Sequence, residues 1–394
     1  MDERQAAIGS SPPFSPSLAT VPHLVAIDLP GGPQFVDALR REWDAGNAVL
    51  PVDRRLPGAA RSALLAAMAP SVVVDTSGRH SLSDGRDVEP GDALVMATSG
   101  STGAAKGVVL THEAVAASAA ATTRRLRMNA SDRWLACLPL SHVGGLSVVT
   151  RAILTHTSLV VHDGFDVARV EEAVRDGVTA VSLVATAMQR LDPSIFRIVV
   201  LGGSRPPAAW PPHVHTTYGM TETGSGVVYD GWPLDGVDVR VTDDAEVHLR
   251  CPMLLRAYRD GSTPVDSDGW LHTGDLGRWL SDGRLHIDGR RGDLIITGGE
   301  NVWPEPIEAL VAQHPGVADV AIVGIPDTEW GQRVTAFVVP RSEPPTLADL
   351  RALVTESMPA FCAPKDMRLV ESLPRTALGK VQRHLLTSLS EPAP

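Results

Sequence analysis

The sequence predicts an α/β protein with a large N-terminal domain of mostly parallel sheet layers, which includes a β-rich subdomain, and a small α+β C-terminal domain. Three observations support this prediction. Between about residues 70 and 202, short β-branched runs alternate with helical patterns, as in layered α/β proteins. From about 232 to 290, short strands are separated by Gly, Asp and Pro turns. After Arg290, a compact segment mixes helical and strand patterns.

The N-terminal alternation provides the strands and helices of the main sheet layers. The expected strands lie at 71–76, 93–98, 133–138, 158–163, 178–184 and 196–202, and the expected helices at 112–127, 144–155 and 166–176. Thr111 can cap the first of these helices, and Glu113 favours its N-terminal dipole. Residues 1–35 are rich in Pro, Ser and Gly and indicate a loose lead-in. Parallel strands joined by helices place a ligand crevice at the carboxyl ends of the strands.

The C-terminal residues predict a separate α+β domain. Its expected elements are a helix at 305–314, strands near 317–324 and 333–339, a helix at 346–357 and a terminal element at 381–388. A boundary near Gly292 divides the chain into domains 1–291 and 292–394, with the β-rich subdomain at about 232–290 inside the first.

Composition excludes several classes of protein. A formal net charge of −11 gives no basic footprint for nucleic acid. No apolar run approaches the roughly 18 to 20 residues that cross a bilayer, and Asp2 and Glu3 stand where a secretory signal carries basic residues. We therefore expect a cytoplasmic protein without stable membrane insertion. Cys137, Cys251 and Cys362 lie far apart, which indicates neither a disulfide framework nor a zinc site. The sequence leaves open whether the protein forms a homo-oligomer.

The segment TSGSTGAAKG (98–107) is the most informative local pattern. Its hydroxyl and glycine residues follow a strand, and such a loop can surround phosphate oxygens with backbone N–H groups. A flexible Gly/Ser turn is the alternative. A Walker A loop is excluded because Lys106 is followed by glycine and then by a strand. The phosphate-binding candidates are Thr98, Ser99, Gly100, Ser101, Thr102, Gly103 and Lys106.

With this loop, the chain resembles the adenylate-forming superfamily of acyl-CoA synthetases, adenylation domains and luciferases. Further motifs of that superfamily follow in order along nearly the whole chain: LPLSHVGGL (138–146), LGGSRPP (201–207), YGMTET (218–223), LHTGDLG (271–277), GRRGDLIITGGENVWPEPIE (289–308) and PRTALGK (374–380). The resemblance implies an ATP-dependent acid–thiol ligase that uses ATP, Mg²⁺ and coenzyme A and acts on a small carboxylic acid.

The resemblance also implies roles for individual residues. Tyr218 can stack on adenine, Thr221 can donate to the α-phosphate, and Glu222 can hold Mg²⁺ through hard carboxylate oxygens. Asp275 can accept the ribose hydroxyls and Arg290 can bind ribose or phosphate oxygens. Further nucleotide-binding candidates are Gly203, Ser204 and Gly219.

Other motif residues are implied to act on the acyl group, on CoA and in domain motion. His142 stands at the acyl pocket, with a structural histidine as the alternative. Gly298 and Gly299 leave room for the CoA pantetheine, although a tight hairpin explains them equally well. Lys380 reaches into the nucleotide site during adenylation, and Gly292 takes the hinge position, where most members carry Asp or Lys.

Residues 138–166 indicate which carboxylic acid is the substrate. They most resemble the o-succinylbenzoate:CoA ligases of menaquinone biosynthesis. Three alternatives remain open: a CoA ligase for another aromatic or medium-length acid, a stand-alone adenylation enzyme that loads a carrier protein, and a non-catalytic nucleotide-binding relative. The last would be expected to have lost Glu222, Lys380 or the loop glycines, which are all present. The segment before the phosphate loop is shorter than in most members, which leaves the walls of the acyl pocket less defined.

Overall fold

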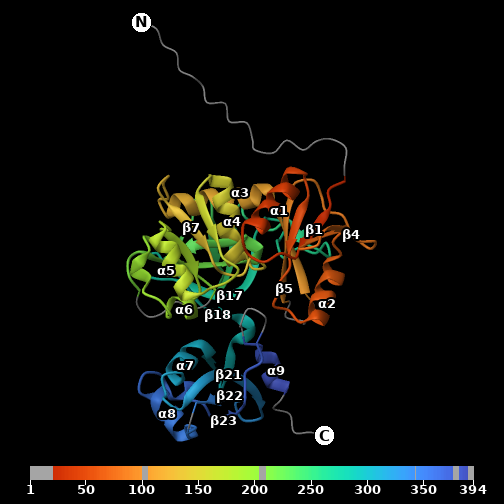
Figure 1. Cartoon of the computed structure of the whole chain (residues 1–394). Helices are drawn as coiled ribbons and strands as arrows, with labels where there is room; N and C mark the ends of the chain where they lie inside the picture. The colour runs from red at the N-terminus through yellow and green to blue at the C-terminus, as the bar shows by residue number, and fades with distance from the viewer. Residues whose placement is uncertain (1–20, 100–104, 204–209, 342, 376–380, 389–394) are drawn as a thin grey trace. The chain divides into compact units, whose positions relative to one another are not determined.

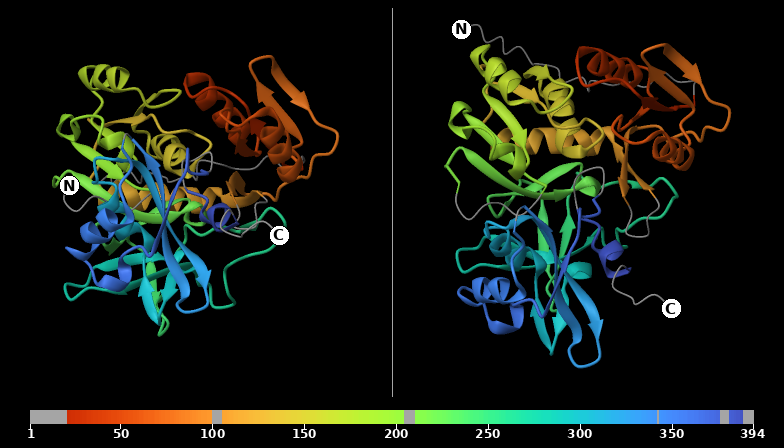
Figure 2. Two further views of the ribbon diagram at one scale, coloured as in Figure 1. Left: turned by 90° about the horizontal axis from the view of Figure 1, so that it is seen from below. Right: turned by 60° about the horizontal axis from the view of Figure 1, so that its bottom comes forward.

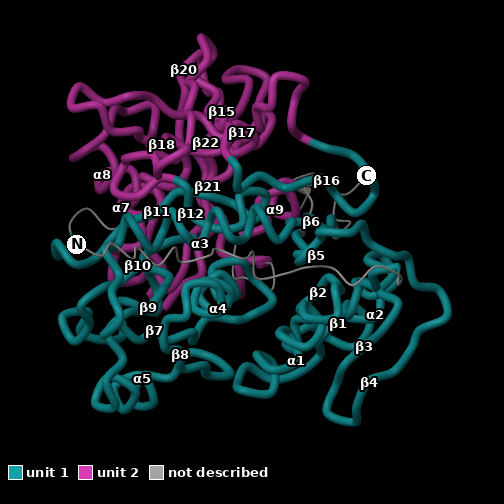
Figure 3. The backbone as a smooth tube through the Cα atoms, turned by 90° about the horizontal axis from the view of Figure 1, so that it is seen from above, with its two compact units in different colours: residues 1–227, 252–263 teal, residues 228–251, 264–394 magenta. Residues whose placement is uncertain are grey.

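The computed structural model describes residues 21–99, 105–203, 210–341, 343–375 and 381–388. The chain forms two compact units, which consist of residues 1–227 with 252–263 and of residues 228–251 with 264–394 (Figure 3). The β-rich segment is therefore grouped with the C-terminal residues. The predicted domain boundary near Gly292 lies inside the second unit and stays a prediction.

A mixed seven-stranded sheet forms one half of the first unit, in the order β16-β6-β5-β2-β1-β3-β4. Its strands are β1 (Leu24–Ile27), β2 (Ala48–Pro51), β3 (Val72–Asp75), β4 (Gly78–Ser81), β5 (Asp92–Ser99), β6 (Ala105–Thr111) and β16 (Ala257–Tyr258). The inner strand β1 pairs in parallel with β2 and β3 and is fully buried. The prediction of a loose lead-in over 1–35 is therefore wrong for this strand. Four apolar residues are enough to form a strand here because parallel partners on both sides supply backbone hydrogen bonds.

The second sheet of this unit carries the strands between residues 133 and 229. It includes β7 (Arg133–Ala136), β8 (Ser158–Val161), β9 (Ala180–Leu183), β10 (Ile198–Leu201), β11 (Val214–Met220) and β12 (Ser225–Tyr229). The pairs from β8 through β7, β9 and β10 to β11 are all parallel, which confirms the predicted parallel layer. The chain leaves the first unit within β12, whose end pairs with β13 (Trp232–Pro233).

Helices separate and cover these two sheets (Figures 1 and 2). Helix α3 (His112–Arg125) packs on β5 and β6, while α4 (Val143–Thr155) packs on β7, β8 and β9, and the two helices pack on each other. Thr111 caps α3 as predicted, because its side chain accepts from the Ala114 N–H at 3.1 Å. The opposite face of the second sheet is covered by α5 (Val167–Arg175) and α6 (Ala185–Met188). Helices α1 (Pro33–Asp44) and α2 (Gly58–Met68) pack against the first sheet.

The second unit begins with the predicted β-rich segment. It forms a four-stranded antiparallel sheet of β14 (Asp238–Val241), β15 (Glu246–Arg250), β17 (Leu271–Trp279) and β18 (Leu285–Arg290). Residues 252–263 leave this segment and belong to the first unit, where β16 joins the edge of the first sheet.

The C-terminal residues form a five-stranded sheet with helices on both faces. The strands are β19 (Ile295–Thr297), β20 (Glu300–Val302), β21 (Val317–Asp327), β22 (Gly331–Pro340) and β23 (Asp366–Leu369). Alternate residues of β21 face opposite sides, as strand geometry requires. Val320 and Ile322 pack with α7 (Pro304–Val311) and α8 (Leu347–Thr355), while Val323 packs with α9 (Arg383–Ser388). Among the described residues, no helix combines the length and apolarity that a membrane span requires.

Candidate active site

Strands β5 and β6 hold the two ends of the predicted phosphate loop together. Thr98 faces Lys106 across the antiparallel pair, and its hydroxyl donates to the Lys106 carbonyl at 3.4 Å. This pairing confirms that a strand follows the loop. The remaining loop candidates, Gly100, Ser101, Thr102 and Gly103, lie outside the described residues, as does the side chain of Ser99.

A short 3-10 turn at Thr221–Thr223 follows β11 and carries two of the predicted catalytic residues, Thr221 and Glu222. The Thr223 hydroxyl fixes the turn, because it donates to the Met220 carbonyl at 2.9 Å and accepts from the Met220 N–H at 3.0 Å. Gly219, just before the turn, has no room for a side chain, since a Cβ there would lie 2.2 Å from the Ser225 carbonyl oxygen.

The two glycines that follow β10, Gly202 and Gly203, lie next to the end of β11. The Thr217 hydroxyl donates to the Leu201 carbonyl at 3.3 Å, and a Cβ on Gly202 would lie 2.8 Å from that hydroxyl oxygen. Gly203 therefore lies close in the fold to half-buried Tyr218, as expected from the carboxyl ends of neighbouring parallel strands. Ser204 lies outside the described residues.

Tyr258 on β16 is a residue that the sequence prediction missed. Its hydroxyl donates to Glu222 Oε1 at 2.9 Å, and the Lys106 ammonium lies 4.8 Å from the centre of its ring. The Leu255 N–H also donates to the Glu222 carbonyl at 2.7 Å. The first unit thus brings together Lys106 at the end of the phosphate loop, Glu222 and the tyrosine between them.

His142 lies at the N-cap of α4, in the predicted turn between β7 and this helix. Its Nε2 atom lies 2.9 Å from Arg55 Nη2 and 3.3 Å from Asp53 Oδ2. Arg55 in turn donates to both carboxylate oxygens of Asp53, at 2.9 and 2.7 Å. These two partners were also missed, since the segment PVDRRLP (51–57) carries no sign of a distant histidine.

The surroundings of His142 keep its ring neutral. Burial lowers the pKa of His142 to about 4; the Asp53 carboxylate opposes this shift and the Arg55 guanidinium adds to it. An arginine can donate only to the unprotonated ring nitrogen, so the proton stays on Nδ1. For Asp53, burial raises the pKa, but hydrogen bonds and charge from Arg55 outweigh it, and the pKa is lowered. The cluster is therefore an Asp–Arg ion pair beside a neutral imidazole.

The second unit pairs two further candidates directly. Arg290 Nε donates to Asp275 Oδ1 at 3.0 Å, across the antiparallel pair of β17 and β18. Asp275 is 8% exposed, and its N–H donates to the Thr273 hydroxyl at 3.0 Å. The predicted ribose acceptor is thus held in place while half of the Arg290 side chain is exposed. Gly292 is exposed, with open space where a Cβ would be.

Gly298 and Gly299 connect β19 to β20 as a two-residue hairpin loop. Both have positive φ, +60° and +84°, which two-residue hairpin loops favour and which glycine adopts without strain. A Cβ on Gly298 would also lie 3.0 Å from the Trp330 ring. The hairpin alternative thus explains both glycines, and their role toward CoA stays a prediction. Lys380 lies outside the described residues.

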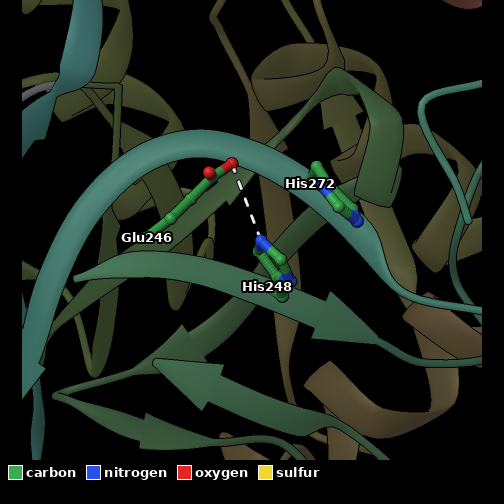
Figure 4. Close-up of side chains that lie close together, drawn as sticks. All are labelled: Glu246, His248 and His272. Carbon is green, nitrogen blue, oxygen red and sulfur yellow. Dashed lines mark ion pairs between the residues drawn. The ribbon is translucent and has the colours of Figure 1, made fainter. Parts of the chain in front are cut away.

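One further cluster has the residue types of a metal site. The donor atoms of Glu246, His248 and His272 lie within 4.8 Å of one another on β15 and β17 (Figure 4). Arg240 Nη2, however, lies 2.9 Å from His248 Nδ1, and Arg291 Nη2 lies 3.3 Å from Glu246 Oε2. Two guanidinium groups thus bind two of the three candidate ligands, and we assign no metal to this cluster.

Comparison with known proteins supplies a context for this geometry. Residues 76–251 match the AMP-binding enzyme family, and residues 306–380 match the AMP-binding enzyme C-terminal domain. The probable 2-succinylbenzoate–CoA ligase of Mycobacterium tuberculosis (strain CDC 1551 / Oshkosh) is 38% identical over 329 residues, which cover 77% of this chain and 85% of that protein.

Two solved structures of o-succinylbenzoate CoA synthetase from Bacillus subtilis are also similar. The complex with the acyl-adenylate intermediate has a TM-score of 0.83 at 26% identity and covers 94% of this chain and 88% of that chain. The complex with ATP and magnesium ion has a TM-score of 0.82 at 26% identity and covers 92% of this chain and 89% of that chain.

Proposed function

Since the chain belongs to the AMP-binding enzyme family, we propose that it is an ATP-dependent o-succinylbenzoate:CoA ligase. The geometry that carries the activity is the meeting of the β5–β6 hairpin with the Glu222 turn, joined through Tyr258. The acid is proposed from the 138–166 pattern and from the similar proteins, which are named for this acid.

The reaction needs two steps because a free carboxylate is a poor acyl donor. In the first, a substrate carboxylate oxygen attacks the α-phosphorus of ATP, the bond to the bridging oxygen breaks, and pyrophosphate leaves. In the second, the CoA thiolate attacks the carbonyl carbon of the acyl-adenylate, and AMP leaves with the electrons of the broken C–O bond. A thioester, AMP and pyrophosphate result.

The residues proposed for the first step neutralise and orient negative charge. The β5–β6 loop supplies backbone N–H groups to phosphate oxygens, Lys106 adds a cation at its end, and Thr221 donates to the α-phosphate. Tyr218 stacks on the adenine.

Mg²⁺ supplies charge neutralisation of the phosphates when bound, and Glu222 fits it. Its hard carboxylate lies on a fixed turn, and Tyr258 donates to one oxygen only; among the described residues, none donates to the other. The proposed set of binding residues also includes Asp275, Arg290 and the glycines proposed for CoA, which all belong to the second unit. We place the reaction in the cytoplasm, which contains both ATP and CoA.

A pyrophosphate-release screen tests this proposal. The purified protein is given ATP, Mg²⁺ and one acid at a time from a panel of o-succinylbenzoate, other aromatic acids, fatty acids and amino acids, each with and without CoA. We expect kcat/KM to be highest for o-succinylbenzoate and sustained turnover to require CoA.

The outcomes separate the alternatives. Faster turnover of another acid would remove the proposed substrate but keep the ligase. Turnover that stays at a single adenylate equivalent with CoA, and continues with a carrier protein, would indicate a carrier-loading enzyme. Failure to release pyrophosphate with every acid would leave a nucleotide-binding relative.

A further inference from the structure

We propose that Tyr258 is a positioning residue that holds the Glu222 carboxylate for the metal ion bound with ATP. This inference rests on the proposed function, because Glu222 is the proposed metal ligand. Its basis is the 2.9 Å hydrogen bond from the Tyr258 hydroxyl to Glu222 Oε1. A side chain held through one oxygen keeps one direction for the other and loses less freedom when a cation binds.

The strand that carries Tyr258 is itself fixed. Tyr258 pairs with Val108 on β6, and the flanking residue Arg259 donates through its N–H to the Gly107 carbonyl at 2.6 Å. These backbone contacts set the distance between β16 and the strand that leaves the phosphate loop. Tyr258 is therefore held against β6 through the backbone, while its hydroxyl contacts Glu222.

Two arginine side chains anchor this strand on either side of the tyrosine. Arg256 makes a bidentate ion pair with buried Asp92, at 2.8 and 2.9 Å. The Arg259 side chain donates to the carbonyls of Met68 at 3.0 Å and Asp87 at 2.8 Å. Charged groups of this kind are expensive to move out of their hydrogen bonds. The anchors therefore hold the chain on both sides of Tyr258.

Lys106 adds a third member to the arrangement. Its ammonium lies 4.8 Å from the centre of the Tyr258 ring, within the range of a cation–π contact. The ring thus contacts the cation at the end of the phosphate loop, while its hydroxyl contacts the carboxylate.

The test measures ATP binding without any acid, so that it does not depend on the identity of the substrate. Calorimetry gives the Kd of ATP in EDTA and in excess Mg²⁺ for the natural protein and for Tyr258→Phe. We expect the same Kd in EDTA. The gain in ATP affinity on adding Mg²⁺ should be smaller by about tenfold, because the variant lacks one hydrogen bond to a charged group.

Glu222→Gln supplies the second arm. This variant should lose most of the gain in ATP affinity that Mg²⁺ gives. The double variant with Tyr258→Phe should lose no more of that gain, because both residues act on the same metal. Tyr229→Phe is the matched control. It removes a hydroxyl from a fully buried tyrosine on β12 and should leave the gain from Mg²⁺ unchanged.

The possible results are distinct. An unchanged gain from Mg²⁺ in Tyr258→Phe, additive losses in the double variant, or an equal loss of affinity in EDTA and in Mg²⁺ would each overturn the positioning role and leave the proposed function standing. If the natural protein binds no ATP, the proposed function fails, and the role of Tyr258 fails with it.

Discussion

A neutral histidine next to a fixed cation defines the chemistry available near the predicted acyl pocket. Because His142 accepts from Arg55 and is buried, it offers an N–H donor at Nδ1 but no positive charge. Such a ring can donate to a polar substrate atom, whereas the Arg55 guanidinium, whose side chain is 49% exposed, is already paired with the Asp53 carboxylate.

The first prediction concerns the protonation of His142. With a pKa of about 4 in the folded state against an ordinary 6.5, the folded protein resists binding a proton that the unfolded chain takes up. The contribution of this group to stability is therefore present above pH 6.5 and is lost as the pH falls toward 4. Between pH 7.5 and 5 the loss is about 2 kcal/mol.

An NMR titration of the imidazole groups checks this prediction. The signal that disappears in His142→Gln should not shift between pH 8 and pH 5.5. Urea unfolding at pH 7.5 and pH 5 should show a smaller loss of stability in His142→Gln than in the natural protein. A midpoint near 6.5 for this signal would show that the burial and the Arg55 contact do not hold in solution.

Asp275 carries a second residue-level prediction. If it accepts the ribose hydroxyls, Asp275→Asn should raise the KM for ATP by roughly 10- to 100-fold, the value of a charged hydrogen bond, and leave the KM for the acid nearly unchanged. Asp288→Asn on the neighbouring strand β18 is the control, because it also removes a carboxylate paired with an arginine, here Arg278. An equal effect of both variants on both KM values would assign Asp275 a structural role.

Motif residues could be predicted from the sequence, but their supporting partners could not. The turn that carries Glu222 follows β11, a strand that was not predicted. Tyr258 lies 36 positions from Glu222 in the sequence, and Arg55 lies 87 positions from His142. An isolated Tyr or Arg in a loop-like segment has no local pattern that indicates such a partner, since tertiary contacts alone determine the pairing.

At the scale of elements, the first turn of α4 determines where His142 lies. The His142 carbonyl accepts from the N–H groups of Gly145 at 3.0 Å and Leu146 at 2.9 Å, so the turn is closed tightly. Two adjacent glycines occupy it in different surroundings. A Cβ on Gly145 would lie 2.4 Å from the Pro139 carbonyl oxygen, whereas a Cβ on Gly144 would have its nearest neighbour, a Leu138 methyl carbon, at 3.9 Å.

Gly145→Ala and Gly144→Ala form a matched pair of variants. The first should destabilise the protein by ~1–3 kcal/mol, because backbone atoms must shift to admit the methyl group, and should raise the KM for the acid as His142 moves. The second should be neutral or stabilising by ~0.4–1 kcal/mol, because alanine restricts the unfolded chain. Thermal unfolding and acid saturation curves measure both. Equal behaviour of the two variants would contradict the packing difference.

Helices and strands with strong local patterns were predicted well, and those that depend on distant partners were missed. The strands β3, β5, β7, β8, β9 and β10 lie at the predicted positions, as do α3, α4 and α5. β1 consists of four apolar residues between Pro-rich and Gly-rich segments, and β16 consists of two residues. Such short segments become strands because an existing sheet offers backbone partners, which a local pattern does not reveal.

At the scale of the whole molecule, the predicted site residues divide between the two units. The phosphate-loop ends, His142, Tyr218, Thr221 and Glu222 belong to the first unit, while Asp275, Arg290 and the glycines at 292, 298 and 299 belong to the second. The C-terminal part of the second unit is tied by Arg383 on α9, which donates to both Glu308 oxygens at 2.8 and 2.9 Å. This ion pair fixes the helix that follows the segment with Lys380.

Lys380→Ala tests whether the C-terminal residues 292–394 act differently in the two half-reactions. The resemblance implies that Lys380 stabilises charge while the carboxylate and the α-phosphate meet, and that a rotation at Gly292 then removes it. The variant should therefore lose acyl-adenylate formation by at least ~10²–10³-fold, as expected for a preorganised group that acts in the transition state, while thioester formation from supplied acyl-AMP and CoA is largely retained. Gly292→Pro should give the opposite pattern, because proline restricts φ and opposes a hinge. Single-turnover measurements of each step on each variant decide the matter. If Lys380→Ala slows both steps equally, the lysine stays at the site throughout, and a rotation of residues 292–394 is not part of this mechanism.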